Sequence, residues 1–195
     1  MVGFTGSAEQ MTSQKRIMNA MAGLLGKFPY NSISVQSICD AADVSRKTFA
    51  RHFASKEEVV IAQIHADFVE PIRALLNIMS FQEVANSTQL LYKRSYDAFY
   101  EHRDYYLRVI DALGIMWFVQ QHMDATLALG DAPYIGNKIG EDGAVGDGIE
   151  ADFARHFFSG VGALGIKWWV EHDFCISSKE LANLVARWGY ARLDG

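Results

Sequence analysis

Apolar residues recur every three or four positions along most of the chain, which is the spacing of amphipathic α-helices. The first such helix is expected to begin after Thr12 or Ser13, because either hydroxyl can cap its first turn. Pro29-Tyr30-Asn31 then interrupts the pattern. The apolar face of this helix consists of Ile17, Ala20, Met21, Leu24, Leu25 and Phe28. The start of the chain therefore predicts one helix that buries a single face.

Two shorter helices are predicted next, and a tight turn joins them. Ser34 caps the first helix and Ser45 caps the second. Asp43 lies at the turn, where aspartate tolerates left-handed backbone better than most residues do. Ser55-Lys56-Glu57-Glu58 has serine at the N-cap and glutamate three residues later. This capping-box pattern predicts the start of a longer fourth helix.

The remainder of the chain keeps the helical pattern. Pro71 is expected to kink or end the fourth helix, because proline lacks the amide hydrogen that a helix interior uses. Six glycines and one proline between residues 130 and 148 predict a loop. Further helices are expected at 88–102, 103–127, 150–171 and from the capping box at Ser177 to about residue 190. The sequence thus predicts an all-α protein, with a three-helix head at residues 1–56 and a helical bundle at residues 57–195.

Charge separates the head from the rest of the chain. The whole chain has a formal net charge of −5, which by itself argues against nucleic acid as a partner. Residues 1–56, however, contain seven Lys and Arg against three acidic residues, whereas the remainder contains 11 against 20. A head of net charge +4 on a body of net charge −9 indicates that one end of the molecule meets a polyanion.

Two short helices joined by a tight turn, behind a longer helix, predict a helix-turn-helix. In such a unit the core of three helices holds the N-terminal, outward face of the third helix toward the major groove of DNA. Arg46 and Lys47 can donate to guanine edges or phosphates, and Gln36 and the hydroxyl, imidazole and ammonium groups nearby can also reach DNA. The predicted DNA contacts are Ser34, Gln36, Ser45, Arg46, Lys47, Thr48, His52 and Lys56.

The stretch SVQSICDAADVSRKTFARHFASKEEVV closely resembles the signature of the TetR family of bacterial transcriptional regulators. The matching residues are Ser34, Ile38, Ala42, Val44, Ser45, Thr48, His52, Phe53, Ser55, Lys56 and Glu57. The resemblance covers residues 12–64 and implies a homodimer that binds a palindromic DNA operator, most often as a repressor, and that a small-molecule effector releases.

Three positions depart from the family pattern, with Asp43 and Lys47 in place of glycines and Ala50 in place of a tyrosine that contacts a phosphate in relatives. The lost phosphate contact should weaken DNA binding. It leaves open an alternative, in which the head no longer binds DNA and the protein is a co-regulator that acts through a protein partner.

The stretch Gly160-Val161-Gly162-Ala163-Leu164-Gly165 fits the G-x-G-x-x-G pattern of dinucleotide sites, but it lacks a preceding strand and a βαβ unit. We expect no NAD and no other cofactor. Glycines in a helix interior cost about 1 kcal/mol each relative to alanine, so the close approach of another helix must offset them. The TetR resemblance implies that the last two helices pair with their copies in a second subunit. The predicted dimer contacts are Phe158, Gly162, Gly165, Ile166, Trp169, Leu181 and Leu184.

The family resemblance also implies an effector pocket inside the body. An aromatic and methionine-rich lining would suit an apolar or flat molecule, although the same stripe is also typical of a plain core. The predicted lining residues are Tyr96, Phe99, Tyr105, Met116, Trp117 and His122.

Several other classes of function lack a pattern in the sequence. No metal site, no catalytic motif and no membrane-spanning run is recognisable, so we expect neither an enzyme nor a membrane partner. Cys39 and Cys175 are expected to be free thiols, which together with the absence of a secretory signal favours the cytoplasm.

Overall fold

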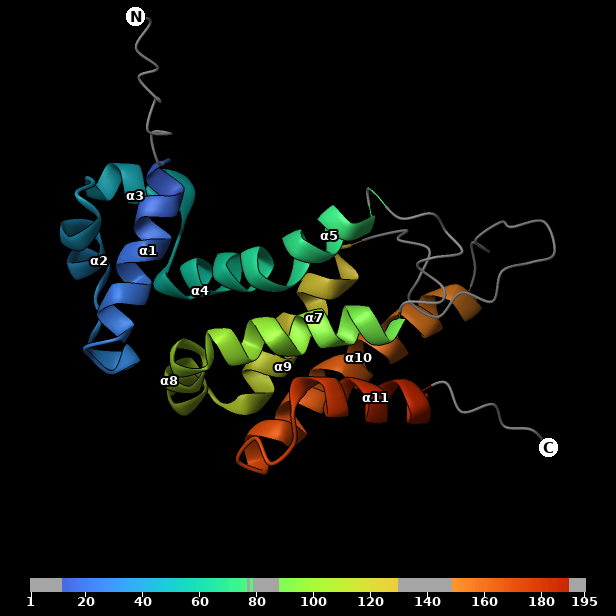
Figure 1. Cartoon of the computed structure of the whole chain (residues 1–195). Helices are drawn as coiled ribbons and strands as arrows, with labels where there is room; N and C mark the ends of the chain where they lie inside the picture. Colours follow the sequence, from blue (N-terminus) through green and yellow to red (C-terminus); the bar gives the residue numbers. More distant parts are fainter. Residues whose placement is uncertain (1–11, 77, 79–87, 130–148, 190–195) are drawn as a thin grey trace, which may run out of the picture. The chain divides into compact units, whose positions relative to one another are not determined.

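The computed structural model describes residues 12–76, 78, 88–129 and 149–189 (Figure 1). All regular elements in these ranges are helical, as the sequence predicts. The chain divides into two compact units, Met1–Ala62 and Gln63–Gly195, which we call the head and the body. The division falls within helix α4 (Lys56–Ile64), at whose start the sequence predicts the boundary.

The head contains three helices and the first part of α4. Helices α1 (Ser13–Leu25), α2 (Val35–Ala42) and α3 (Arg46–His52) pack together around one apolar core. A 3₁₀ turn, Tyr30–Ser32, precedes α2. The buried side chains of this core are Ile17, Met21, Leu25, Tyr30, Ile33, Ile38, Cys39, Ala42, Phe49, Phe53, Val59 and Val60. Phe28 was predicted in the apolar face, but α1 ends before it and its side chain is exposed.

The helix boundaries of the head follow from the caps that the sequence predicts. The hydroxyls of Thr12, Ser34 and Ser45 each accept a hydrogen bond from the amide three residues later. These bonds satisfy amides that have no partner inside their helix. Asp43 ends α2 in the left-handed conformation, with φ 50° and ψ 54°. The chain can therefore reverse between α2 and α3 within a few residues.

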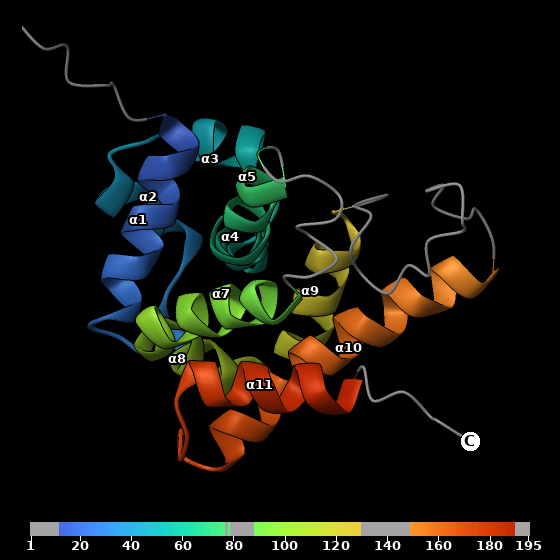
Figure 2. The ribbon, with the colours of Figure 1, turned by 45° about the vertical axis from the view of Figure 1, so that its right-hand side comes forward.

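The body is a set of longer helices. Its elements are a π-turn at His65–Val69, α5 (Glu70–Leu76), α7 (Thr88–Glu101), α8 (Arg103–Leu113), α9 (Ile115–Leu127), α10 (Ile149–Glu171) and α11 (Ser178–Gly189). Helix α7 lies along α11, and α9 lies along α10 (Figures 1 and 2). The second predicted capping box is present at the start of α11, where Ser177 and Glu180 exchange hydrogen bonds between backbone amides and side chains.

The body differs from the sequence prediction at two places. Pro71 was expected to kink or end the fourth helix, but α4 already ends at Ile64, and Pro71 lies in the first turn of α5, directly after the π-turn. The stretch predicted as one helix at 103–127 is two helices, because Gly114 adopts φ 90° between α8 and α9. The predicted loop at 130–148 lies outside the described residues.

Aromatic rings fill the centre of the body. Phe68 from the π-turn meets Tyr106 and Phe118, with centroid distances of 5.4 and 6.1 Å. Phe99 stacks on Tyr106 at 5.5 Å and meets Phe118 edge-on at 5.4 Å. All four rings are fully buried. This cluster joins the π-turn to α7, α8 and α9.

Candidate nucleic-acid interface

The outward face of α3 presents three positive charges to solvent. Arg46, Lys47 and Arg51 are all exposed, and Lys47 and Arg51 are four residues apart on one side of the helix. Within the described part of the chain, no acidic side chain forms an ion pair with any of the three. Neighbouring cations without counter-charges repel each other, so an anionic partner would stabilise this surface.

The sequence prediction omits Arg51. Helical spacing could have found it, because a residue four positions after Lys47 must lie on the same face of α3. Ala50 is exposed between these cations and adds no bulk to the surface. The family pattern has a tyrosine that contacts phosphate at the position of Ala50. Arg51, the next residue, is exposed and can contact a phosphate instead.

The predicted hydroxyl contacts hold the ends of helices. The Ser45 hydroxyl accepts a bond of 3.0 Å from the Thr48 amide and lies 2.9 Å from the Thr48 hydroxyl. The Ser34 hydroxyl accepts 3.0 Å from the Ser37 amide, and the Ser37 hydroxyl in turn accepts from the Ser34 amide. Both serines are exposed at the N-termini of helices. Their helices begin with amides and hydroxyls that suit phosphate oxygens.

Arg16 of α1 fixes the turn between α2 and α3. Its Nε and Nη2 atoms donate to the carbonyl oxygen of Ala42, at 3.0 and 2.7 Å. Nη2 also donates to the carbonyl oxygen of Asp43 and lies 3.7 Å from the Asp43 carboxylate. A planar guanidinium can serve several acceptors at once, which an ammonium group cannot do in the same geometry. The orientation of α3 is thus tied to α1 through one side chain.

Lys56 was predicted to bind phosphate, and it already has structural partners. Its ammonium group donates to the carbonyl oxygens of Tyr30 and Ile33, both at 3.0 Å, and lies 4.2 Å from the centre of the Tyr30 ring. The Tyr30 hydroxyl donates to the Glu57 carboxylate at 2.8 Å. Burial and this bond raise the pKa of Tyr30 above its ordinary value. Burial alone would raise the pKa of Glu57, but the hydrogen bonds that it accepts lower it overall. Lys56 therefore supports the turn before α2, whatever else it binds.

The two remaining predicted DNA contacts have neighbours within the head. The His52 ring is half-buried, 6.4 Å from the Phe53 ring, with Nε2 3.5 Å from the guanidinium of Arg51. The Gln36 amide donates to the Asp40 carboxylate at 2.8 Å, although its side chain is exposed. Both side chains remain at the surface of the head.

The predicted effector-lining residues do not share one environment. Tyr96 and Phe99 are fully buried, Tyr105 and Trp117 are half-buried, and Met116 is 56% exposed. Burial of this extent raises the pKa of Tyr96 above its ordinary value. Most of these residues lie in or next to the packed aromatic core, whereas Met116 faces solvent.

His122 is a polar side chain inside that core. The ring is 3% exposed, and Nε2 lies 3.0 Å from the Ser95 hydroxyl. Nδ1 has no hydrogen-bond partner among the described residues. Burial lowers the pKa of His122 to about 4, so the ring is neutral at pH 7.

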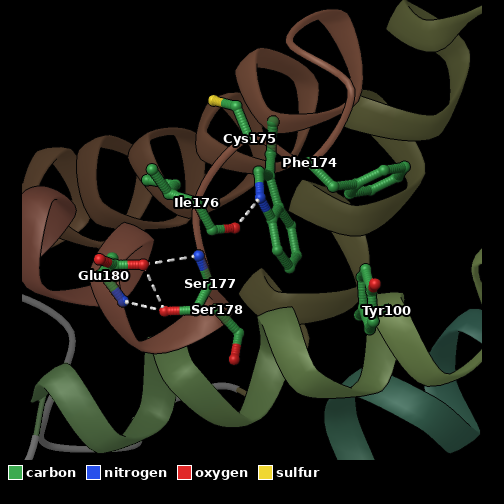
Figure 3. A pocket seen from close by; sticks show the side chains of 8 residues that line it. Tyr100, Phe174, Cys175, Ile176, Ser177, Ser178 and Glu180 are labelled. Carbon is green, nitrogen blue, oxygen red and sulfur yellow. Dashed lines mark hydrogen bonds between the residues drawn. The ribbon is translucent and has the colours of Figure 1, made fainter.

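An open hollow of about 430 Å³ lies near the turn between α10 and α11 (Figure 3). The rings of Tyr100 and Phe174 lie on one side of it, and Ser177, Ser178 and Glu180 lie on the other. The Trp169 indole, which also lines the hollow, donates to the carbonyl oxygen of Ile176 at 2.7 Å. None of the predicted effector-lining residues borders this hollow.

The glycines of α10 are explained within one chain. A Cβ atom at Gly162 would lie 2.9 Å from the Tyr92 ring, and one at Gly165 would lie 3.1 Å from the ring of Tyr96. Tyr96 is buried and its hydroxyl donates to the Gly162 carbonyl at 3.4 Å. The glycines lie inside a helix, without the strand and turn of a dinucleotide site.

This packing uses most of the predicted dimer contacts within one chain. Gly162, Gly165, Ile166, Trp169 and Leu181 are buried inside the chain, because α10 and α11 use these positions against α7 and against each other. Phe158 and Leu184 are half-buried. The helix that the glycines approach is α7 of the same subunit, and their contact with a second subunit stays a prediction.

The opposite face of α10 carries a row of exposed apolar side chains. Phe153, Phe157, Leu164 and Trp168 are between 38% and 67% exposed. Their spacing of four, seven and four residues places them on one side of the helix. Trp188 of α11 is 74% exposed. We call the four residues of α10 the outer stripe.

Two further classes of site can be assessed in the described residues. No three His, Cys, Asp or Glu side chains lie together there as a metal site requires. None of the helices in those ranges combines the length and the apolar composition of a membrane crossing.

Residues 17–62 match the sequence profile of a family described as "Bacterial regulatory proteins, tetR family". The match covers most of α1, all of α2 and α3 and most of α4, which include the cationic face, and it begins one residue after Arg16. No curated protein matches the sequence significantly.

Three solved structures share the fold over nearly the whole chain. The "Dihydroxyacetone kinase operon activator DhaS" is 21% identical, with a TM-score of 0.54 over 90% of this chain and 93% of that one. The fatty acid degradation regulator FadR from Bacillus halodurans is 16% identical, with a TM-score of 0.54 over 95% and 98%. A putative TetR-family transcriptional regulator from Syntrophomonas wolfei str. Goettingen is 12% identical, with a TM-score of 0.56 over 90% and 92%.

The profile and the three structures agree on the class of protein. All of them belong to regulators or to an operon activator, and none belongs to an enzyme, as the sequence predicts for this chain. The helix-turn-helix head and its matched profile identify residues 17–62 as the helix-turn-helix domain of the TetR family of bacterial transcriptional regulators, and the helical body shares the fold of the solved regulators.

Proposed function

We propose that the chain is a cytoplasmic homodimer that binds a palindromic operator in double-stranded DNA, represses transcription there, and is released by a small-molecule effector. The operator contacts come from α3 and from the start of α2. The body binds the effector and a second copy of the chain.

The observation that carries the DNA-binding part is the unpaired charge on α3. In the body, some acids and bases form pairs at helical spacing, such as Lys93–Asp97 at 2.5 Å and Lys167–Glu171 at 2.5 Å. On α3 three exposed cations have no such partner among the described residues. A row of phosphates would supply the missing negative charge, and release of counterions would drive association.

The contacts divide by chemistry. Arg46 and Lys47 lie in the first turn of α3, where a recognition helix meets base edges. Ser34, Ser45, Thr48 and the amides that they cap suit phosphates, as does Arg51. Gln36, His52 and Lys56 have partners within the head, so we expect them to add less.

The dimer part rests on the outer stripe. Four large apolar side chains on one helix face form a surface that a monomer in water would leave exposed. A second copy would cover the same stripe about a two-fold axis, which is the usual symmetry of such pairs. Trp188 and the half-buried Phe158 and Leu184 would extend this contact.

The effector part rests on linkage. A molecule that binds best to a subunit arrangement mismatched to the operator lowers DNA affinity by its difference in binding energy between the two arrangements. Repression is proposed as the outcome because the family resemblance implies it most often. One of the three similar structures is that of an operon activator, so a transcription assay must decide the direction of control.

Fluorescence anisotropy with a labelled duplex of mixed sequence, at several salt concentrations, tests DNA binding. We expect a steep loss of affinity with salt, and Arg51→Ala should reduce the slope of log K against log salt by about one unit. Arg46→Ala and Lys47→Ala should instead change the preference among duplex sequences. Lys93→Ala is the control, because Lys93 is a half-buried cation of the body that is paired with Asp97.

Selection of bound fragments from the source genome then identifies the operator, against which the same variants are compared. Leu164→Glu, which puts a charge in the outer stripe, should give monomers in sedimentation and lose the preference for a full palindrome over a half-site. If the wild-type protein does not bind the duplex at low salt, the head is not a DNA-binding domain. A co-regulator that binds a protein partner would then be the better hypothesis.

A further inference from the structure

His122 contains a buried polar atom whose partner is missing from the described structure. The ring is 3% exposed and bonds to Ser95 through Nε2 alone. The other buried polar side chains nearby are satisfied, since Thr126 and Ser159 bond to each other and to backbone oxygens of α9. A buried nitrogen without a partner is costly, and such atoms in native proteins call for an explanation.

One ring from the π-turn covers His122. The centroid of Phe68 lies 4.7 Å from that of His122, with the rings at 70°, and Phe118 lies at 6.0 Å. Phe68 is itself fully buried. Of the aromatic rings in contact with His122, Phe68 is therefore the nearer one, and its displacement would make room beside the histidine.

The π-turn that carries Phe68 is held by its neighbour Asp67. The Asp67 carboxylate accepts from Tyr106 at 2.6 Å and Gln63 at 2.9 Å, and lies 2.7 Å from His102 Nδ1. π-turns are rare and occur often at functional sites, because they place one extra residue in a helical turn. Here the turn follows α4 directly, so it lies between the head and the rest of the body in the chain.

We propose that His122 and Phe68 form the effector-sensing contact of the body, and that the effector is a small uncharged molecule which displaces the Phe68 ring and hydrogen-bonds to His122 Nδ1. The inference rests on the proposed function, because it specifies the chemical class of the effector proposed there and the first movement that its binding causes.

The surroundings favour an uncharged molecule. The rings around His122 are apolar, and His122 itself is neutral at pH 7. Asp67, on the same turn as Phe68, would repel an anion. A cation would lose its hydration among the apolar rings around His122, and the Asp67 carboxylate is already in contact with Gln63, His102 and Tyr106.

Displacement of Phe68 would transmit effector binding from His122 to the π-turn. A molecule that merely filled an empty space would leave the backbone unchanged. A molecule that moves Phe68 must also move the π-turn, whose register the Asp67 contacts define. Binding energy is then differential between two arrangements of the turn, as a ligand-driven switch requires.

Four probes of nearly the same shape test the proposal on the full chain: benzyl alcohol, toluene, benzoate and benzylammonium. Binding is measured by calorimetric titration, and the π-turn is followed by hydrogen exchange of the amides at residues 65–69. We expect benzyl alcohol to bind about five-fold more tightly than toluene, the factor of one buried hydrogen bond, and the two ions to bind much more weakly. Benzyl alcohol should also speed exchange in the π-turn.

Variants connect this result to the two residues. His122→Phe keeps a ring of similar size without the nitrogen, so benzyl alcohol should lose its advantage over toluene. Phe68→Leu leaves a smaller side chain over His122 and should bind benzyl alcohol several-fold more tightly. His156→Phe, which replaces an exposed histidine of α10, is the control and should bind all four probes as wild type does.

Two outcomes would overturn the inference. One is benzoate or benzylammonium binding as tightly as benzyl alcohol, and the other is His122→Phe retaining the five-fold preference. The DNA titration of the wild type is a separate measurement. Protein that binds DNA but shows neither the preference nor the exchange response would refute this inference alone, whereas protein that shows both but ignores DNA would refute the proposed regulator.

Discussion

The head and the body use polar side chains in opposite ways. In the head, polar groups act at the surface, where Arg16 and Lys56 hold backbone carbonyls and the cations of α3 face solvent unpaired. In the body, some charges pair at helical spacing, as Lys93 does with Asp97, and hydroxyls and a histidine lie inside the core. The head therefore uses its polar side chains to fix the backbone and to present cations to solvent. The body instead places several polar side chains within its core.

The two units also differ in how they use glycine. Gly23 of α1 faces open space, since a Cβ atom added there would meet nothing within 4 Å. Gly165 of α10 lies against the buried Tyr96 ring, and Val185 is 3.4 Å from the position of its Cβ. The same residue type is dispensable in the head and required in the body.

The largest expected effect breaks the packing of the body. Gly165→Val should lower the free energy of unfolding by about 3 kcal/mol, because Tyr96 is fully buried and cannot move aside. Urea denaturation of the variant against wild type measures this difference. Gly23→Ala is the matched control and should stabilise the chain by about 0.5–1 kcal/mol through its helix propensity. Equal effects at both positions would contradict the contrast between the units.

A second prediction concerns pH and the buried histidine. The pKa of His122 is about 4 in the folded chain and about 6.5 when unfolded, so the unfolded state binds the extra proton between these values. Stability from this group is present above pH 6.5 and is lost as pH falls toward 4. From pH 7 to pH 5 the loss should be about 2 kcal/mol, measured by urea denaturation at both values.

Carboxylates with lowered pKa, such as Glu57 and Asp97, also lose stability in acid. The comparison with His122→Phe removes their contribution, because they are present in both proteins. If the two proteins lose stability equally between pH 7 and pH 5, the ring of His122 is not buried in its neutral form.

The smallest expected effect on stability concerns the brace of the head. Arg16→Lys keeps the charge but cannot serve the Ala42 and Asp43 carbonyls together, so it should cost about 1 kcal/mol of stability. DNA affinity should fall as well, because α3 loses its fixed orientation. Lys15→Arg, at the exposed neighbouring position, is the control for charge and size. If Arg16→Lys keeps wild-type DNA affinity, the turn between α2 and α3 does not depend on the hydrogen bonds of Arg16.

Local signals explain why the head could be predicted in such detail. Each helix of the head has its own serine or threonine cap, and Asp43 marks the left-handed turn, so neighbours in sequence define the elements. The three bonds of Arg16 were not predictable in the same way, since they span 26 or 27 residues. Exposure of Arg51 follows from helical spacing and was available in the sequence.

The body shows where sequence patterns fail. Gly114 ends a helix that apolar spacing alone would continue, because it adopts φ 90°. The π-turn depends on Asp67 and on partners as distant as Tyr106, which no local pattern records. The glycines of α10 required knowledge of α7, whose Tyr92 and Tyr96 lie 66 or more residues away in sequence from the atoms that they contact. The inner and outer faces of α10 are both apolar, so composition could not tell them apart.

The hydrogen bonds of Arg16 limit which segment of the head can be grafted onto another protein. The α2–α3 pair is continuous in sequence, but the guanidinium that bonds to the turn between the two helices belongs to α1. A chimaera that borrows residues 34–53 alone would leave the Ala42 carbonyl without this donor. The smallest exchangeable piece therefore begins upstream of Arg16, at the Thr12 cap of α1.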